Sequence, residues 1–76
     1  MESKFITVET FDKINVELLL RVSTLNNEPQ GDKPFIVVRF DDKGHRESNN
    51  EFDSIIDAVD YIHTLYFDFE ITQEVK

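Results

Sequence analysis

Residues 14–22 read INVELLLRV, an alternation of apolar and polar side chains that is broken once, at Leu19. A period of two is typical of a β-strand with one face buried and the other exposed. Residues 4–11 alternate in the same way, and the polar pair Asp12-Lys13 between the two stretches indicates a tight hairpin. The sequence therefore predicts antiparallel strands at about 4–11 and 14–23.

Two more strands follow a loop. Residues 24–34 are rich in Asn, Pro and Gly, whereas residues 35–40, FIVVRF, form an apolar run rich in β-branched side chains. Such a run is typical of an interior strand. Residues 41–44, DDKG, have the composition of a turn with glycine in a left-handed conformation. We expect strands at about 35–41 and 45–52, the second of them polar and at an edge.

The apolar period then lengthens to that of a helix, at about 54–66. The expected inner stripe contains Phe52, Ile55, Ile56, Val59, Ile62, His63 and Tyr66. Asp53 or Ser54 should cap this helix, and Ser54 and Asp57 have the spacing of a capping box. The pattern returns to two at Phe67, so we expect the tail, 67–76, to be a strand or flexible.

These elements predict an α+β fold. A single domain over residues 1–76 would contain an antiparallel meander of three to four strands packed on one amphipathic C-terminal helix, with a further C-terminal strand as an alternative for the tail. The chain has no cysteine, so its core must come from aliphatic and aromatic packing, which its seven Phe and 39% hydrophobic residues can supply.

Composition narrows the classes of partner. The N-terminus lacks the features of a secretory signal and no apolar run approaches membrane-spanning length, so we expect a cytoplasmic protein. A formal net charge of −8 repels phosphates, which disfavours direct binding to nucleic acid or to anionic membranes. A basic protein surface is the favoured partner.

No motif for catalysis or metal binding is visible. The chain lacks a glycine-rich phosphate loop and a nucleophile in a motif with a base, so we expect no enzyme activity, no catalytic residues and no cofactor. His45 and His63 have no ligand spacing, and we expect His63 to be partly buried at the core boundary. Residues 41–47 lack the alternating acids of a calcium loop, so no metal site is predicted.

Acidic residues are concentrated in the C-terminal part. Residues 47–75 contain eight acidic residues and no Lys or Arg, while residues 1–46 are nearly neutral. A surface of one charge sign steers a partner of the opposite sign; the alternative is an ordinary solvated face. The predicted partner-binding acidic face comprises Asp53, Asp57, Asp60, Asp68 and Glu70, the first three on one side of the helix.

The predicted sheet has more apolar residues than one helix can cover. If the residues of strand three that face the helix are Ile36, Val38 and Phe40, an apolar set remains on the other side: Phe5, Phe11, Leu19, Phe35 and Val37. This set could be covered by the tail, bind a partner or form a dimer interface. The alternative function is therefore a homodimeric structural or assembly protein.

The short strand meander, the acidic helix and the absence of cysteine resemble the small inhibitors encoded by bacteriophages and mobile elements, which include anti-CRISPR and anti-restriction proteins. Some members of this group imitate the charge of DNA. The resemblance implies that the chain occludes a basic nucleic-acid-binding groove in a bacterial host, with Asp53, Asp57, Asp60, Asp68 and Glu70 in place of phosphates. The charge-balanced N-terminal half departs from that pattern.

Overall fold

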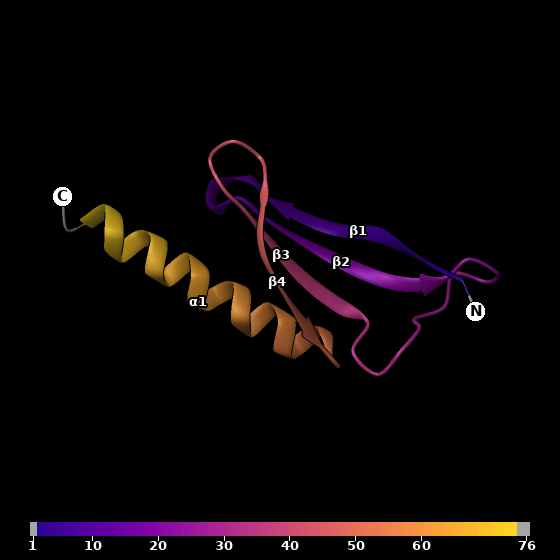
Figure 1. The fold of residues 1–76 in the computed structure, drawn as a ribbon. Helices are drawn as coiled ribbons and strands as arrows, with labels where there is room; N and C mark the ends of the chain where they lie inside the picture. The colour runs from indigo at the N-terminus through magenta and orange to yellow at the C-terminus, as the bar shows by residue number, and fades with distance from the viewer. Residues whose placement is uncertain (1, 75–76) are drawn as a thin grey trace.

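The structure is a computed structural model that describes residues 2–74. It contains one antiparallel sheet with strand order β1-β2-β3-β4, and one helix crosses a single face of this sheet (Figure 1). The elements are β1 (Ser3–Phe11), β2 (Val16–Ser23), β3 (Phe35–Phe40), β4 (Arg46–Phe52) and α1 (Ile55–Glu74). The predicted α+β meander packed on a C-terminal helix is confirmed.

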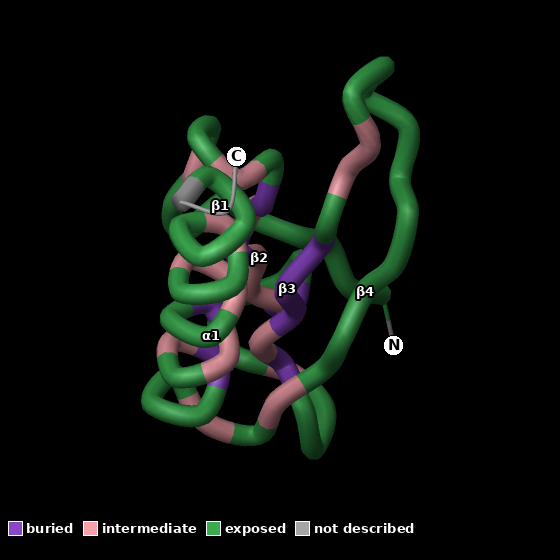
Figure 2. Tube along the Cα trace, turned by 90° about the vertical axis from the view of Figure 1, so that its left-hand side faces the viewer, coloured by how far each residue is buried: buried purple, intermediate pink, exposed green. Residues whose placement is uncertain are grey.

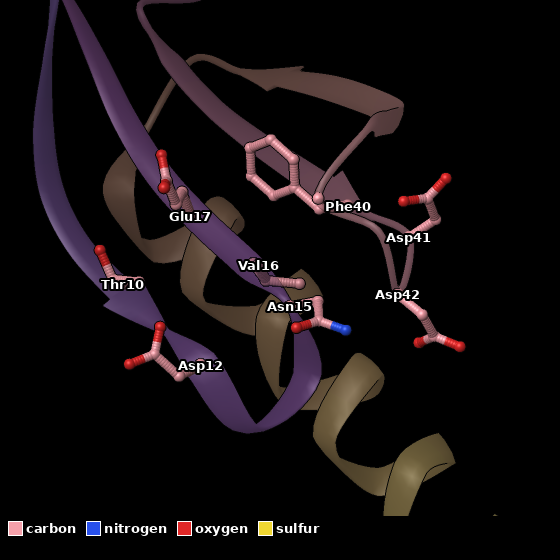
Figure 3. Close-up of a pocket in the computed structure, with 9 residues that line it drawn as sticks. Thr10, Asp12, Asn15, Val16, Glu17, Phe40, Asp41 and Asp42 are labelled. Atoms are coloured by element: carbon pink, nitrogen blue, oxygen red, sulfur yellow. The ribbon is translucent and has the colours of Figure 1, made fainter.

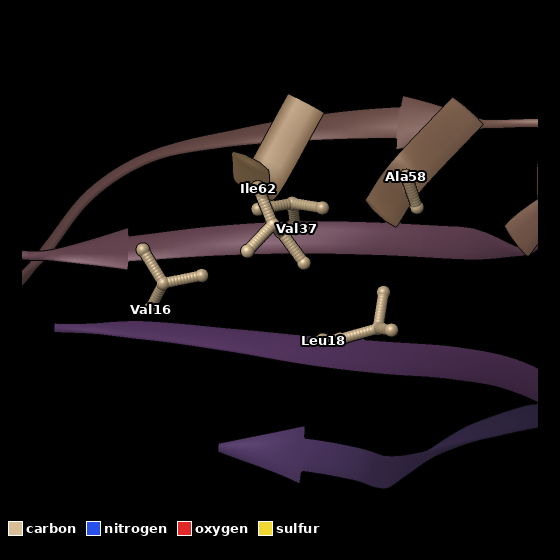
Figure 4. Close-up of a cluster of buried hydrophobic side chains, with 5 residues drawn as sticks. All are labelled: Val16, Leu18, Val37, Ala58 and Ile62. Atoms are coloured by element: carbon tan, nitrogen blue, oxygen red, sulfur yellow. The ribbon is translucent and has the colours of Figure 1, made fainter. Parts of the chain in front are cut away.

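The core lies between α1 and the two central strands. Ala58 and Ile62 of the helix pack against Val16 and Leu18 of β2 and Val37 of β3 (Figure 4). Ala58 is fully buried, and its small side chain permits a close approach of the helix to the sheet. Partly buried side chains surround this cluster: Phe11, Ile14, Phe35, Phe52, Tyr61, Leu65 and Tyr66.

The link between β1 and β2 is not the tight hairpin that the sequence predicts. Residues 12–14 form a 3-10 turn, η1 (Asp12–Ile14), and Asn15 after it has a left-handed backbone with φ 56°. The Asn15 backbone N–H donates a hydrogen bond of 3.3 Å to the Asp12 carbonyl. Ile14 therefore lies outside β2, and its side chain packs against the edge of the core.

A bulge in β1 changes which side chains face the helix. Thr7 pairs with Leu19 on the face away from α1, but Phe11 pairs with Val16 on the helix side, because the register shifts around Val8. One extra residue in a strand reverses the faces of all that follow it. The expectation that Phe11 faces away from the helix is therefore wrong.

The faces predicted for β3 are also reversed. Val37 pairs with Leu18, and Phe35 pairs with Leu20, so both lie on the helix side of the sheet. Directly paired residues project from the same face, which places three residues on the opposite, open face: Ile36, Val38 and Phe40. The apolar run of β3 has no alternation, so only the register with β2 decides its faces.

The open face is covered by its own side chains. Arg21 of β2 and Glu51 of β4 form an ion pair of 3.4 Å across the central strand β3. Ile36 lies between their strands and is 4% exposed. The Arg21 guanidinium also lies 5.4 Å from the centre of the Phe5 ring. Of the predicted outward-facing apolar set, only Phe5 and Leu19 remain on this face.

Helix α1 begins where the sequence predicts and ends later. The Ser54 hydroxyl accepts a hydrogen bond of 3.2 Å from the Asp57 backbone N–H, which confirms the predicted cap. The helix continues through residues 67–74, so the expected tail strand is wrong there; residues 75–76 lie outside the described part. Each residue added to an existing helix gains one backbone hydrogen bond, so residues 67–74 are helical although their apolar residues alternate as in a strand. Within residues 2–74, no helix combines the length and apolarity that crossing a membrane requires.

Ile62 and Phe67 provide a test of this packing. Ile62 is 1% exposed and Phe67 is 63% exposed. We expect Ile62→Ala to lower the free energy of unfolding by about 2–5 kcal/mol, because it leaves a cavity at the core, and Phe67→Ala to change it by less than about 0.5 kcal/mol. Urea denaturation followed by circular dichroism measures both. A comparable loss from Phe67→Ala would contradict this helix orientation.

Candidate functional site

Three of the five predicted acidic residues lie on one side of α1. Asp57, Asp60 and Asp68 are all exposed, and at about 100° per residue they project within about 80° of one another. Asp53 precedes the helix, in the bend before it. Glu70 projects about 160° away from Asp68. The structure therefore brings three of these carboxylates together and separates the other two from them.

Apolar side chains lie beside these carboxylates. Ile56 is 70% exposed and Phe67 is 63% exposed, and Ile71 is also exposed. These three side chains project within about 60° of one another, on the side of α1 opposite the core, and Asp60 projects between two of them. We name the combined set the outer helix surface: Ile56, Asp57, Asp60, Phe67, Asp68 and Ile71.

Sequence reasoning missed the apolar part of this surface. Ile55, Ile56 and His63 were expected on the inner stripe, and all three are exposed. The inner side instead contains Ala58, Tyr61, Ile62, Leu65 and Phe69. The helix has apolar residues on both sides, so the apolar period alone does not decide which side of the helix faces the sheet. The signal for the outer stripe is the spacing of Ile56, Phe67 and Ile71, which is helical only if the helix continues past residue 66.

Within residues 2–74, the carboxylates of the outer helix surface form no ion pair, although Asp68 lines a hollow beside the helix together with Arg39. Two ion pairs are present among residues 2–74, Arg21 with Glu51 and His45 with Asp41, and neither involves α1. The last turn of α1 contains no basic residue. Lys13 lies 5.8 Å from the centre of the Phe69 ring, on the inner side of the helix. In the described part of the chain, Asp57 and Asp60 are therefore exposed carboxylates that no ion pair neutralises.

A second group of carboxylates lies away from α1. A pocket of about 330 Å³ opens beside the β1–β2 and β3–β4 connections (Figure 3). Its lining comprises Thr10, Asp12, Asn15, Val16, Glu17, Phe40, Asp41, Asp42 and Gly44. The two connections are joined by a 2.9 Å hydrogen bond from the Phe40 N–H to the Asn15 carbonyl. No sequence pattern could reveal this pocket, because its acids come from three separate segments.

One of these acids has a structural role. The Asp41 carboxylate accepts hydrogen bonds of 2.9 and 2.8 Å from the backbone N–H groups of Lys43 and His45. Gly44 has φ 84°, so the predicted glycine turn is confirmed. In the part of the chain that the structure covers, no group of three His, Cys, Asp or Glu side chains is arranged to hold a metal ion.

Thr10 lines this pocket and His45 lies 3.7 Å from the Asp41 carboxylate at its rim, whereas Ser23, Ser54 and His63 lie elsewhere. The Ser23 hydroxyl accepts a bond of 3.1 Å from the Leu25 N–H, and Ser54 caps α1. His45 is exposed in the turn, and His63 is exposed on α1 rather than partly buried.

Comparison of the chain with protein-family models, with curated proteins and with solved structures finds no match.

The charges of α1 oppose its dipole at one end and favour it at the other. Asp57 lies in the first turn and Glu70 near the last. We expect Glu70→Lys to raise the free energy of unfolding by about 0.3–1 kcal/mol and Asp57→Lys to lower it by a similar amount. Urea denaturation at low salt measures both, and the difference should shrink at high salt. Equal shifts in one direction would show that net charge, not the helix dipole, dominates.

Proposed function

We propose that this chain is an acidic protein-binding module that inhibits or regulates a basic, nucleic-acid-handling partner protein, and that it binds this partner through the outer helix surface. The observation that carries the proposal is the exposure of Phe67 and Ile56 among three carboxylates that form no ion pair within residues 2–74. The alternative of a solvated face does not account for those exposed apolar side chains.

The arrangement resembles the centre and rim of a protein interface. Interfaces commonly have aromatic and aliphatic residues at the centre and polar residues around them. Here Phe67 and Ile56 would supply the apolar contacts, and Asp57 and Asp68 would supply an acidic rim on one flank. The helix of 20 residues is about 30 Å long, which is enough to span a groove on a partner.

Electrostatics favours a basic partner. Clustered like charges repel one another in the free protein, so the arrangement costs stability unless a partner neutralises it. A basic surface would relieve this repulsion and would also associate faster, because the field of the carboxylates steers it. A partner that binds nucleic acid has such a surface, and the carboxylates would occupy the positions of phosphates. The resemblance to small phage inhibitors supports this finer version of the proposal.

The binding experiment uses the full chain with an affinity tag, incubated with a bacterial lysate at low and moderate salt. We expect retained proteins to be basic and to elute as salt rises. Replacing Asp57, Asp60 and Asp68 together by Asn should weaken retention about tenfold, taking roughly 0.5 kcal/mol for each exposed charge. Phe67→Ala should weaken it by a similar factor.

Glu28→Gln is the control, because it removes an exposed acid from the loop between β2 and β3 rather than from α1 and should leave retention unchanged. Equal retention by the triple Asn variant and the unmodified chain would refute the proposal. If double-stranded DNA fails to compete with a partner that does depend on the three carboxylates, the nucleic-acid part is wrong and the binding module stands.

A further inference from the structure

The two edges of the sheet differ in composition. The outer strand β4 reads RESNNEF, and its charged and amide side chains are of the kind that discourages pairing with another chain. The other outer strand, β1, reads SKFITVETF, with six β-branched or aromatic residues among nine and no Pro or Gly. Every residue of β1 except Phe11 is exposed. The protein thus protects one edge and leaves the other open.

The exposed edge is also apolar on both faces. Phe5, on the open face, is 52% exposed, and Ile6 and Val8 are exposed large hydrophobic residues of the same strand. Ile6 pairs with Leu20 and so projects toward the helix side. Helix α1 meets β1 at Phe11, whose ring lies 6.1 Å from that of Tyr66, and leaves Ile6 exposed. Figure 2 shows the other edge strand, β4, exposed along most of its length beside the buried residues of β3.

We propose that β1 pairs antiparallel with β1 of a second copy of this chain, which joins two four-stranded sheets into one sheet of eight strands. An open edge presents unpaired backbone N–H and carbonyl groups that another strand can satisfy. Pairing about a two-fold axis uses the same strand from each copy and closes the assembly at two. This inference stands independently of the proposed function.

The charges of β1 select the second copy and the direction of pairing. Lys4 pairs with Val22 and Glu9 pairs with Leu18 in β2, so Lys4 and Glu9 project from the same face. A bulge can turn an edge away from pairing, but here it brings these opposite charges to one face. Val8 is the extra residue of the bulge and has no partner in the ladder, so Lys4 and Glu9 each lie two paired positions from Ile6, the centre of the strand.

Antiparallel pairing about that centre sets Lys4 of each copy beside Glu9 of the other. Parallel pairing in register would instead place Lys4 beside Lys4, and like charges at facing positions are unfavourable. The single chain is also extended for its size, with a radius of gyration of 13.7 Å, whereas a compact chain of 76 residues is expected near about 11.4 Å. Antiparallel pairing of two copies would bury the outer edge of β1 inside a wider sheet of eight strands.

A charge exchange tests the pairing. Sedimentation equilibrium at micromolar concentration should give the unmodified chain about twice its mass of 9.0 kDa. Lys4→Glu and Glu9→Lys should each weaken the dimer about tenfold or more, because each replaces two attractive contacts by repulsive ones. An equimolar mixture of the two variants should form a heterodimer, since one carries only acidic and the other only basic side chains at these positions.

Circular dichroism confirms that each variant is folded, and Asn49→Lys on the protected strand β4 is the control that should leave the dimer intact. An unmodified chain that stays monomeric overturns the proposal. It is also overturned by a dimer that survives both single variants, or by one that Phe67→Ala dissociates while the β1 variants do not, because the interface would then be the outer helix surface.

Discussion

The contact of Ala58 and Ile62 with Val16, Leu18 and Val37 fixes the orientation of everything else in this protein. With one helix over one face of the sheet, the rotation of that helix decides which of its residues become surface. The burial of Ala58 and Ile62 turns Phe67 and Ile56 outward and places Asp60 near the middle of the exposed side. The outer helix surface is therefore a consequence of core packing.

Local sequence patterns were sufficient to predict the strands and the start of the helix, but not to predict which face of the sheet each side chain occupies. The four strands, the Ser54 cap and the glycine turn at Gly44 depend on neighbouring residues and could be predicted from the sequence. The faces of β1 and β3 could not, because the bulge at Val8 and the unalternating run of β3 are resolved only when strands pair. Phe67 was likewise expected in a strand, because apolar and polar residues alternate around it, but α1 extends past residue 66 and includes it.

The candidate site divides in the same way. The concentration of acids after residue 46 is visible in the sequence, and the exposure of Asp57, Asp60 and Asp68 follows from a helix with one buried side. The separation of Asp53 and Glu70 from them depends on the exact start and rotation of α1. The pocket near Asp12 and Glu17 depends on the meeting of two connections, so the nearly neutral N-terminal half has a local acidity that its composition does not reveal.

The C-terminal half of α1 runs past the end of the sheet (Figure 1). A hollow of about 340 Å³ lies along this part of the helix, lined in part by Ile14, Arg39 and Phe69. Helical turns with little packing beneath them open at a lower free energy than the core. The turns that carry Ile71 can thus unwind and re-form while the sheet stays folded. A ligand that binds these turns in their helical form must also order them. The free energy of that local folding is then subtracted from the free energy of the contacts, which lowers the affinity.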